Sequence, residues 1–282
     1  MPYTEINGIN IHYQVSGSGP PLLMMASGGF DSTIEKWTTS GIWTGVRPLE
    51  TLTEKYTCIA YDRREAGLSG GKVERVTWAT YAHEAMGLLN HLGIQQAFVL
   101  GGCMGCSTAT AFGAAYPEAT LGLLLHWPVG GVRWRNNGLE RFQTHVDFVK
   151  QQGLAAVVQL AQEKKSFWGE PAAGPWASTI VADQDFSKRF AEQDQDRYLA
   201  IASLMGQTLF DRDTATGPDP LELMALKVPS VIIPGADAAH ATSAARYLEE
   251  CLEGSVYHDV PVVEQTPDRV RGWITEFIDA HA

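Results

Sequence analysis

A glycine-rich turn around Cys103 constrains the fold of this chain more than any other segment. The apolar residues Ala97 to Leu100 precede the turn, and the small residues Ser107 to Ala115 follow it. This order predicts a buried strand, a tight turn and a helix. Gly101 and Gly105 flank the cysteine, as expected where a turn holds its central residue in a strained backbone conformation. We therefore expect the cysteine side chain to point outward at the end of the strand.

The position of Cys103 makes it a predicted nucleophile. A helix N-terminus behind a thiol stabilises negative charge, which lowers the thiol pKa and favours anionic intermediates. Two other interpretations stay open for this cysteine. It can be a buried core residue, as we expect for Cys58 and Cys251. It can also form a redox dithiol with Cys106, because Cys-x-x-Cys at a helix start is typical of thioredoxin-like proteins.

The length and the charge of the chain limit its function classes. Its 282 residues suit one large α/β domain or a domain with an insertion. The net charge of −11 argues against nucleic acid and anionic membrane surfaces as partners. No apolar stretch approaches the length of a membrane span. We therefore expect a small-molecule substrate, no nucleic acid and no membrane, and the sequence leaves a homodimer open.

Cysteine usage and the N-terminal segment predict the compartment. Four cysteines in a chain of this length do not indicate a disulfide framework. Residues 1–5 lack the charged and then apolar pattern of a secretion signal. The sequence therefore predicts a cytoplasmic protein. It contains no pattern that indicates a metal site or a cofactor, so we expect neither.

Alternating strands and helices predict a mainly parallel sheet that is covered on both faces. Active sites in such sheets form at the carboxyl ends of the strands. The expected strands span residues 8–15, 22–26, 56–61, 97–100, 121–126, 228–234 and 255–260. The expected helices around them span residues 77–92, 107–115, 244–252 and 267–280.

The stretch 128–227 has a different character. Strand patterns disappear, and aromatic and charged residues recur at helical spacing, as in Phe142 and Val149. We interpret this stretch as an inserted helical cap, or lid, that controls substrate choice. Residues 1–127 and 228–282 are then expected to form the core.

Three motifs, taken in their order, resemble the α/β-hydrolase superfamily. They are Ser27-Gly28-Gly29-Phe30, the segment Asp62 to Ser69, and the turn Gly101 to Gly105. The turn matches the superfamily's nucleophile elbow, with cysteine in place of the usual serine. The resemblance covers nearly the whole chain apart from the cap. It implies an α/β-hydrolase fold with a mostly parallel eight-stranded sheet, helices on both faces and an inserted helical cap.

The resemblance also implies an oxyanion hole. The superfamily uses the backbone N–H of the residue after the nucleophile, here Met104, and one from the loop after the third strand, here Gly29 or Phe30. Two such donors stabilise the oxyanion that develops in acyl transfer. The residues expected to line the substrate site are Gly28, Phe30, His126 and Trp127.

The predicted acid and base depart from the superfamily's order. The superfamily places an acid after the strand that ends at Pro234, and Asp237 stands one position earlier than is commonest. It places a histidine in a loop after the last strand, but that loop is missing and His258 falls inside the expected strand. His240 follows Asp237 by three residues. We predict that His240 activates Cys103 and that Asp237 orients it. A role for His258 as the base, and the absence of any base, stay open.

The predicted reaction is attack by the Cys103 thiolate on a small activated ester, lactone or ketone, through a thioester. Cysteine tolerates a displaced base better than serine does because its pKa is closer to neutral. The alternatives are a cofactor-free lyase, decarboxylase or C–C bond hydrolase on the same fold, and a non-catalytic small-ligand-binding protein. Arg63, Arg64 and Glu65 follow a strand end, and we interpret them as a structural ion pair rather than as a site for a carboxylate or an enolate.

Overall fold

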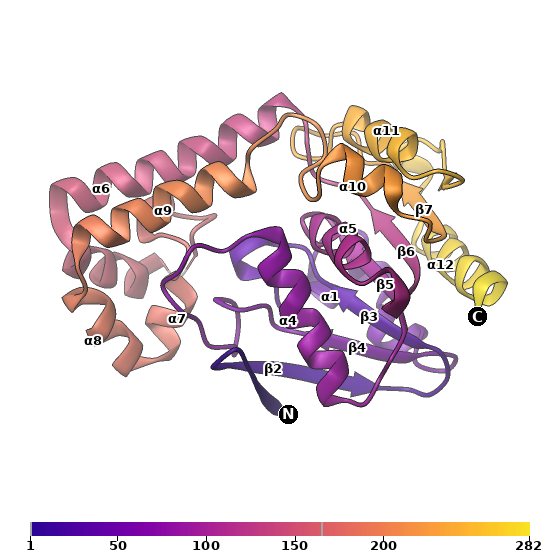
Figure 1. Ribbon diagram of the computed structural model, residues 1–282, viewed down its shortest axis with the longest axis horizontal. Coiled ribbons are helices and arrows are strands. Elements are labelled where there is room, and N and C mark those ends of the chain that lie inside the picture. Colours follow the sequence, from indigo (N-terminus) through magenta and orange to yellow (C-terminus); the bar gives the residue numbers. More distant parts are fainter. Residues whose placement is uncertain (1, 165) are drawn as a thin grey trace.

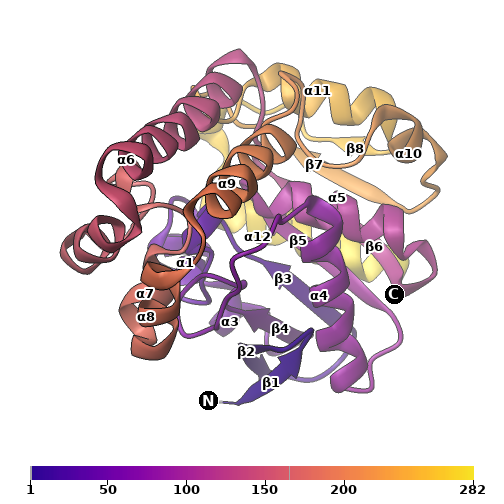
Figure 2. The same cartoon turned by 60° about the vertical axis from the view of Figure 1, so that its left-hand side comes forward.

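The computed structural model describes residues 2–164 and 166–282 of the chain. Its eight strands are β1 (Tyr3–Ile6), β2 (Ile9–Ser16), β3 (Pro21–Met25), β4 (Thr57–Tyr61), β5 (Ala97–Gly102), β6 (Thr120–His126), β7 (Ser230–Ile233) and β8 (Val256–Tyr257). They form one sheet in the order β1-β2-β4-β3-β5-β6-β7-β8 (Figure 2). β2 pairs antiparallel with β1 and with β4, and the other neighbours are parallel. This topology confirms the predicted α/β-hydrolase fold.

Helices cover both faces of the sheet. The helices of the core are α1 (Lys36–Thr39), α2 (Trp43–Val46), α3 (Pro48–Thr51), α4 (Trp78–His91), α5 (Gly105–Ala115), α11 (Thr242–Cys251) and α12 (Pro267–His281). α4 and α5 pack on one face, and α1, α2 and α12 pack on the other (Figure 1). Each face buries its own cluster of apolar side chains, so β3, β4 and β5 are almost wholly buried, as their continuous apolar runs predicted.

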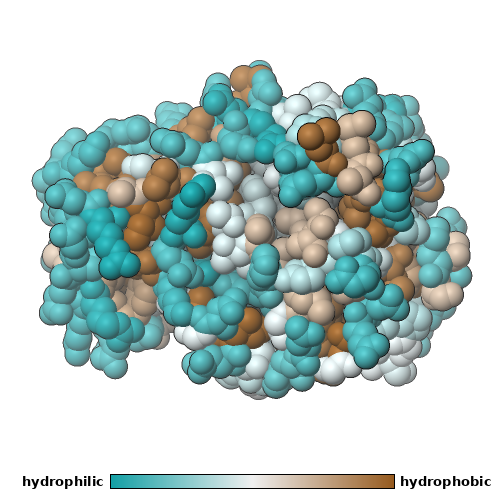
Figure 3. Space-filling model, viewed as in Figure 1, coloured by the Kyte–Doolittle hydropathy of each residue, from teal (hydrophilic) through white to brown (hydrophobic). Residues whose placement is uncertain are grey.

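Between β6 and β7 the described chain consists of helices joined by loops and contains no named strand. Its α-helices are α6 (Val132–Lys164), α7 (Ala177–Ala182), α8 (Gln184–Glu192), α9 (Gln195–Leu209) and α10 (Pro220–Ala225), and we call the whole segment, loops included, the helical insertion. α6 and α9 lie side by side and extend away from the sheet (Figures 1 and 2). α6 kinks at Gly153, where φ is 78°. The face of the molecule shown in Figure 3 is mostly hydrophilic, with separate hydrophobic patches, one of them over the helical insertion.

Most predicted elements agree with the structure to within two residues at each end. The last strand is an exception, because β8 contains only Val256 and Tyr257 instead of the predicted 255–260. A second difference is the hairpin of β1 and β2, whose first strand was not predicted. Asn7 and Gly8 form its turn with φ values of 54° and 71°, which is the backbone that Asn-Gly favours in two-residue hairpins. Among the described residues, no helix combines the length and the apolar character needed to cross a bilayer.

Candidate active site

Cys103 occupies the tight turn between β5 and α5. Its φ of 56° lies in the left-handed region that non-glycine residues rarely adopt. The flanking glycines are required by close backbone contacts. A Cβ on Gly105 would overlap the carbonyl oxygen of Met25, and a Cβ on Gly101 would lie 2.7 Å from the carbonyl oxygen of Gly105. The turn therefore presents a half-buried cysteine at the carboxyl edge of the sheet, in a conformation that the two flanking glycines permit.

Cys106 lies one helical turn further on and has different surroundings. Its thiol is buried and donates to the carbonyl oxygens of Gly101, at 3.2 Å, and His126, at 3.3 Å. Burial raises the pKa of this thiol well above its usual value. A thiol that stays protonated and bonded to two carbonyls is a poor partner in thiol–disulfide exchange. These contacts therefore disfavour the dithiol interpretation of Cys103 and Cys106.

His240 lies in the loop between β7 and α11, and Asp237 holds it there. The carboxylate of Asp237 accepts hydrogen bonds from the backbone N–H groups of Ala239, at 2.8 Å, and His240, at 2.9 Å. Each of the two carboxylate oxygens also lies 2.9 Å from Nδ1 of His240. The aspartate thus fixes both the loop and the orientation of the ring. Nε2 of His240 is buried and has no hydrogen-bond partner among the described residues, so it is the ring nitrogen available to Cys103.

The pKa of His240 depends on its surroundings, which include Cys103 and Asp237. Burial alone would lower the pKa of His240, but the nearby Cys103 sulfur and, after it, the Asp237 carboxylate favour the charged ring and raise the pKa to about 9. Burial alone would raise the pKa of Asp237, but its hydrogen bonds with His240 and Ala239 lower it below its usual value. The arrangement therefore favours a proton on His240, between an ionised carboxylate and a cysteine sulfur.

Trp127 and Gln265 support the ring of His240. Trp127 follows β6 with a φ of 55°, and its indole lies against His240 with ring centroids 5.4 Å apart. Its Nε1 donates to Gln265 at 2.7 Å. The buried amide of Gln265 then donates to the carbonyl oxygens of Pro234, at 2.8 Å, and Val260, at 3.0 Å. One glutamine thus joins the ends of β6, β7 and β8, and it was not among the predicted site residues.

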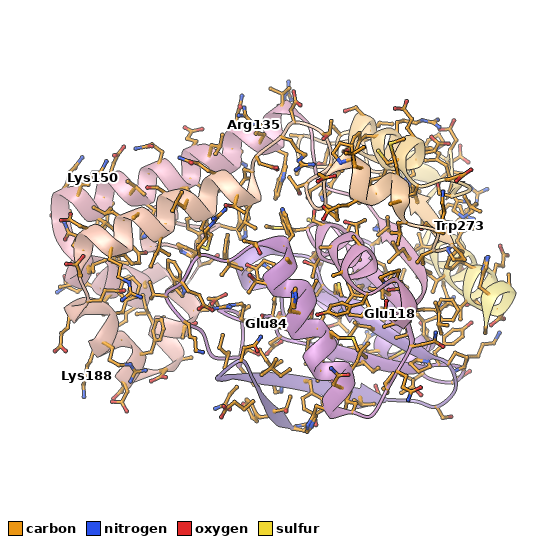
Figure 4. All side chains as sticks on the ribbon, in the orientation of Figure 1. Glu84, Glu118, Arg135, Lys150, Lys188 and Trp273 are labelled. Carbon is orange, nitrogen blue, oxygen red and sulfur yellow. The ribbon has the colours of Figure 1, made fainter. Side chains whose placement is uncertain are left out.

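His258 lies elsewhere. It directly follows β8, and its backbone N–H donates to Ile232 at 3.0 Å. Its ring stacks on Trp273 of α12 at a centroid distance of 4.2 Å, and Figure 4 shows Trp273 at the end of the molecule away from α6 and α9. Burial lowers the pKa of His258. The structure therefore gives this imidazole an aromatic packing partner, and no described carboxylate forms a hydrogen bond or an ion pair with it.

His126 ends β6 and lies directly beside the elbow. Its carbonyl oxygen accepts from the backbone N–H of Cys103 at 3.0 Å. Its ring stacks on Trp127 and lies 4.8 Å from the ring of Trp43. Burial lowers the pKa of His126 to about 3, so the ring is neutral at ordinary pH. Its Nε2 is buried without a partner among the described residues.

The loop after β3 carries the predicted oxyanion-hole residues. Gly28 and Gly29 have φ values of 110° and 57°, and Phe30 is buried against Phe142 and Phe167 of the helical insertion. The N–H groups of Gly29, Phe30 and Met104 donate to none of the described residues. Arg63 and Trp168 contact the carbonyl groups of the glycines, and sequence reasoning assigned neither to the site.

Comparisons with known proteins agree with this architecture. The family described as "alpha/beta hydrolase fold" matches residues 21–197. The uncharacterized hydrolase YraK of Bacillus subtilis is 27% identical over 158 residues, which is 55% of each chain. The chain therefore spans about half the length of this curated relative.

Solved structures match over nearly the full chain. The enol-lactonase from Burkholderia xenovorans has a TM-score of 0.63 and 20% identity, covering 99% of this chain and 100% of that one. A thermophilic esterase from Thermogutta terrifontis has a TM-score of 0.61 and 22% identity, covering 99% and 97%. At these identities the likeness demonstrates a shared fold.

Proposed function

Because this chain belongs to the α/β-hydrolase fold family, we propose that it is a cysteine hydrolase of small activated esters or lactones. Cys103 is the nucleophile, His240 the base, and Asp237 the residue that orients the imidazole. Gly29 and Met104 donate to the oxyanion. The observation that carries this proposal is the placement of His240, whose Nδ1 is bonded to Asp237 and whose buried Nε2 has no partner among the described residues, and the nearby Cys103 sulfur raises the pKa of this ring. An enol-lactonase and an esterase among the proteins of the same fold support this choice of substrate class.

The first half of the reaction forms a thioester. His240 accepts the thiol proton, and the thiolate adds to the substrate carbonyl to form a tetrahedral oxyanion. The N–H groups of Gly29 and Met104 donate to that oxygen, which lowers the barrier. When the intermediate collapses, the C–O bond to the leaving group breaks and the imidazolium protonates the departing alkoxide. A lactone follows the same step, but its leaving group stays attached to the acyl chain.

The second half regenerates the thiol. Neutral His240 removes a proton from water while the oxygen adds to the thioester carbonyl. The new oxyanion occupies the same pair of N–H donors. Its collapse breaks the C–S bond, releases the acid and returns the proton from His240 to the sulfur. The cysteine thus passes from thiol through thiolate to thioester and back to thiol, and Asp237 keeps the tautomer with Nδ1–H throughout.

Replacement of Cys103 tests the proposal directly. We expect Cys103→Ala to abolish turnover of p-nitrophenyl acetate and to remove the acyl adduct seen by mass spectrometry of quenched protein, with little change in Tm. Cys103→Ser is also expected to be poor, because a hydroxyl depends more strongly than a thiol on its base. Cys251→Ala is the matched control, since this cysteine lies in α11. Retention of most activity in Cys103→Ala would refute the proposal, and turnover without an adduct would favour lyase or C–C bond chemistry.

The role of the helical insertion is a second part of the proposal. We propose that residues 128–227 act as a cap that controls substrate choice, with Phe142 and Phe167 against Phe30 as its contact with the oxyanion loop. Replacing the stretch with a short linker is expected to change the relative rates for a series of p-nitrophenyl esters. A variant that folds and keeps the original order of rates would contradict this role.

A further inference from the structure

Gly29 is held from both sides by side chains that are distant in sequence. Nε1 of Trp168 donates to the carbonyl oxygen of Gly28 at 2.8 Å. On the other side, the guanidinium of Arg63 donates to the carbonyl oxygen of Gly29. Trp168 belongs to the helical insertion, and Arg63 follows β4 of the core. The two peptide groups around Gly29 are therefore bonded to different parts of the fold.

The planarity of the peptide links these bonds to the proposed oxyanion hole. In a trans peptide the C=O and the N–H point in opposite directions. The carbonyl of Gly28 shares its peptide group with the N–H of Gly29, so a donor that fixes the first also fixes the second. Trp168 packs so closely here that a Cβ on Gly29 would lie 2.7 Å from its indole. Glycine is required both by this contact and by the φ of 57°.

Trp168 is itself held in place by α6. The guanidinium of Arg141 lies 4.9 Å from the Trp168 ring centroid, and it donates to the Trp168 carbonyl at 2.8 Å. The ring of Trp134 stacks on the indole at 5.8 Å. The direction of the Gly29 N–H thus depends on the position of the helical insertion.

Arg63 differs from its neighbour Arg64. Arg64 is bound by the carboxylates of Glu65, Glu74 and Glu84 at 2.7 to 3.0 Å. The sequence predicted the pair with Glu65, but not the other two carboxylates, and it wrongly included Arg63 in the ion pair. Arg63 is 3% exposed, lies 4.0 Å over the ring of Tyr81 and forms no ion pair within the described residues. Its Nε is buried without a partner. Burial of an unpaired charge is costly, and a nearby anion that forms transiently would offset that cost.

We propose that Trp168 and Arg63 are positioning residues of the oxyanion hole, so that the helical insertion completes a site otherwise built from the core. This inference rests on the proposed function. Trp168 aims the N–H of Gly29, and Arg63 holds and polarises the following peptide and places a positive charge beside the developing oxyanion. Neither side chain contacts the substrate.

Two reactions of the same cysteine separate this role from activation of the thiol. Acylation of Cys103 by p-nitrophenyl acetate passes through an oxyanion, whereas alkylation by iodoacetamide is a displacement at carbon without one. We expect Trp168→Phe to lower the acylation rate about tenfold, since loss of a whole oxyanion donor costs about 10²–10³-fold. The alkylation rate is expected to change less than twofold. Steady-state kcat should fall while KM stays nearly constant.

Matched variants complete the experiment. Trp176→Phe removes an indole donor to the Lys72 carbonyl, a bond of the same 2.8 Å length elsewhere in the helical insertion, and is expected to leave the ratio of the two rates unchanged. Arg63→Met should lower acylation selectively, and Arg63→Lys should restore part of it. A Trp168→Phe protein that loses both rates equally, or neither, overturns the inference. If the unsubstituted protein is alkylated but not acylated at Cys103, the proposed function fails and this inference fails with it.

Discussion

Two neighbouring strands, β7 and β8, are each followed by a histidine, and the structure treats the two in opposite ways. After β7, His240 has a carboxylate on one ring nitrogen and a cysteine sulfur near the other, and its pKa rises to about 9. After β8, His258 stacks on Trp273, and burial lowers its pKa. The difference shows that charged neighbours, and not position at the edge of a sheet, decide whether an imidazole can act as a base.

The segment after β8 contributes in another way. Its Gln265 bonds to Trp127 and to the ends of β7 and β8, and Trp127 in turn contacts His240. The segment therefore supports the loop after β7, which carries the proposed base.

Replacing each histidine in turn is the most direct test of the difference between His240 and His258. Removal of a general base costs about 10²–10⁴-fold in rate, so we expect a loss in that range for His240→Ala. We expect His258→Ala to stay within several-fold. The measurements are turnover of p-nitrophenyl acetate and thiolate titration by ultraviolet absorbance. A large loss in His258→Ala with little change in His240→Ala would reverse the two roles, and small effects in both would favour a thiol without a base.

Asp237→Asn tests the carboxylate that distinguishes the two histidines. Turnover should fall by about tenfold to a hundredfold, less than for removal of the base itself, because the ring remains but is misoriented. Stability should respond to pH with a defined sign. The folded pKa of His240 is raised from 6.5 to about 9, so its stabilising contribution is complete below pH 6.5 and is lost as the pH rises through 9.

The difference in free energy of unfolding between the unsubstituted protein and Asp237→Asn should therefore be largest at pH 6 and smallest at pH 10. The side chain of Asp237 is 52% exposed, so screening limits the difference at pH 6 to about 1 kcal/mol. Urea titrations at both pH values measure it. A gap that widens with pH would contradict an imidazolium bound to Asp237.

Gln265→Leu tests whether the segment after β8 supports His240, and we expect the smallest effect on rate from this variant. Loss of the amide leaves the Trp127 indole and two strand-end carbonyls without partners, so the ring that supports His240 gains freedom. We expect a loss of about threefold to tenfold in kcat and a lower Tm, because each unpaired buried group costs about 1–3 kcal/mol. Gln265→Glu keeps the acceptor for Trp127 and should recover part of the rate. A drop in Tm without any change in kcat would show that the segment after β8 supports the fold alone.

Much of the fold could be predicted because its signals are local. The buried strands appear as apolar runs, and the elbow appears as glycines around Cys103. The hairpin at Asn7-Gly8 also carried a local signal, although the prediction missed it. The extent of β8 had no such signal, because its pairing with β7 depends on what packs against it.

The sequence by itself determined the α/β architecture, the cysteine at the elbow and the close spacing of Asp237 and His240. It could not determine which imidazole approaches Cys103, since His240 and the cysteine lie far apart along the chain. It also did not mark Gln265 and Trp168 as supports of the site, and it favoured a structural ion pair for Arg63. Their side chains donate to backbone carbonyl groups. Every residue has such a carbonyl, so no sequence pattern indicates which one a given side chain will contact. Only the tertiary structure brings each donor to its carbonyl, because packing of the sheet and the helical insertion sets those distances.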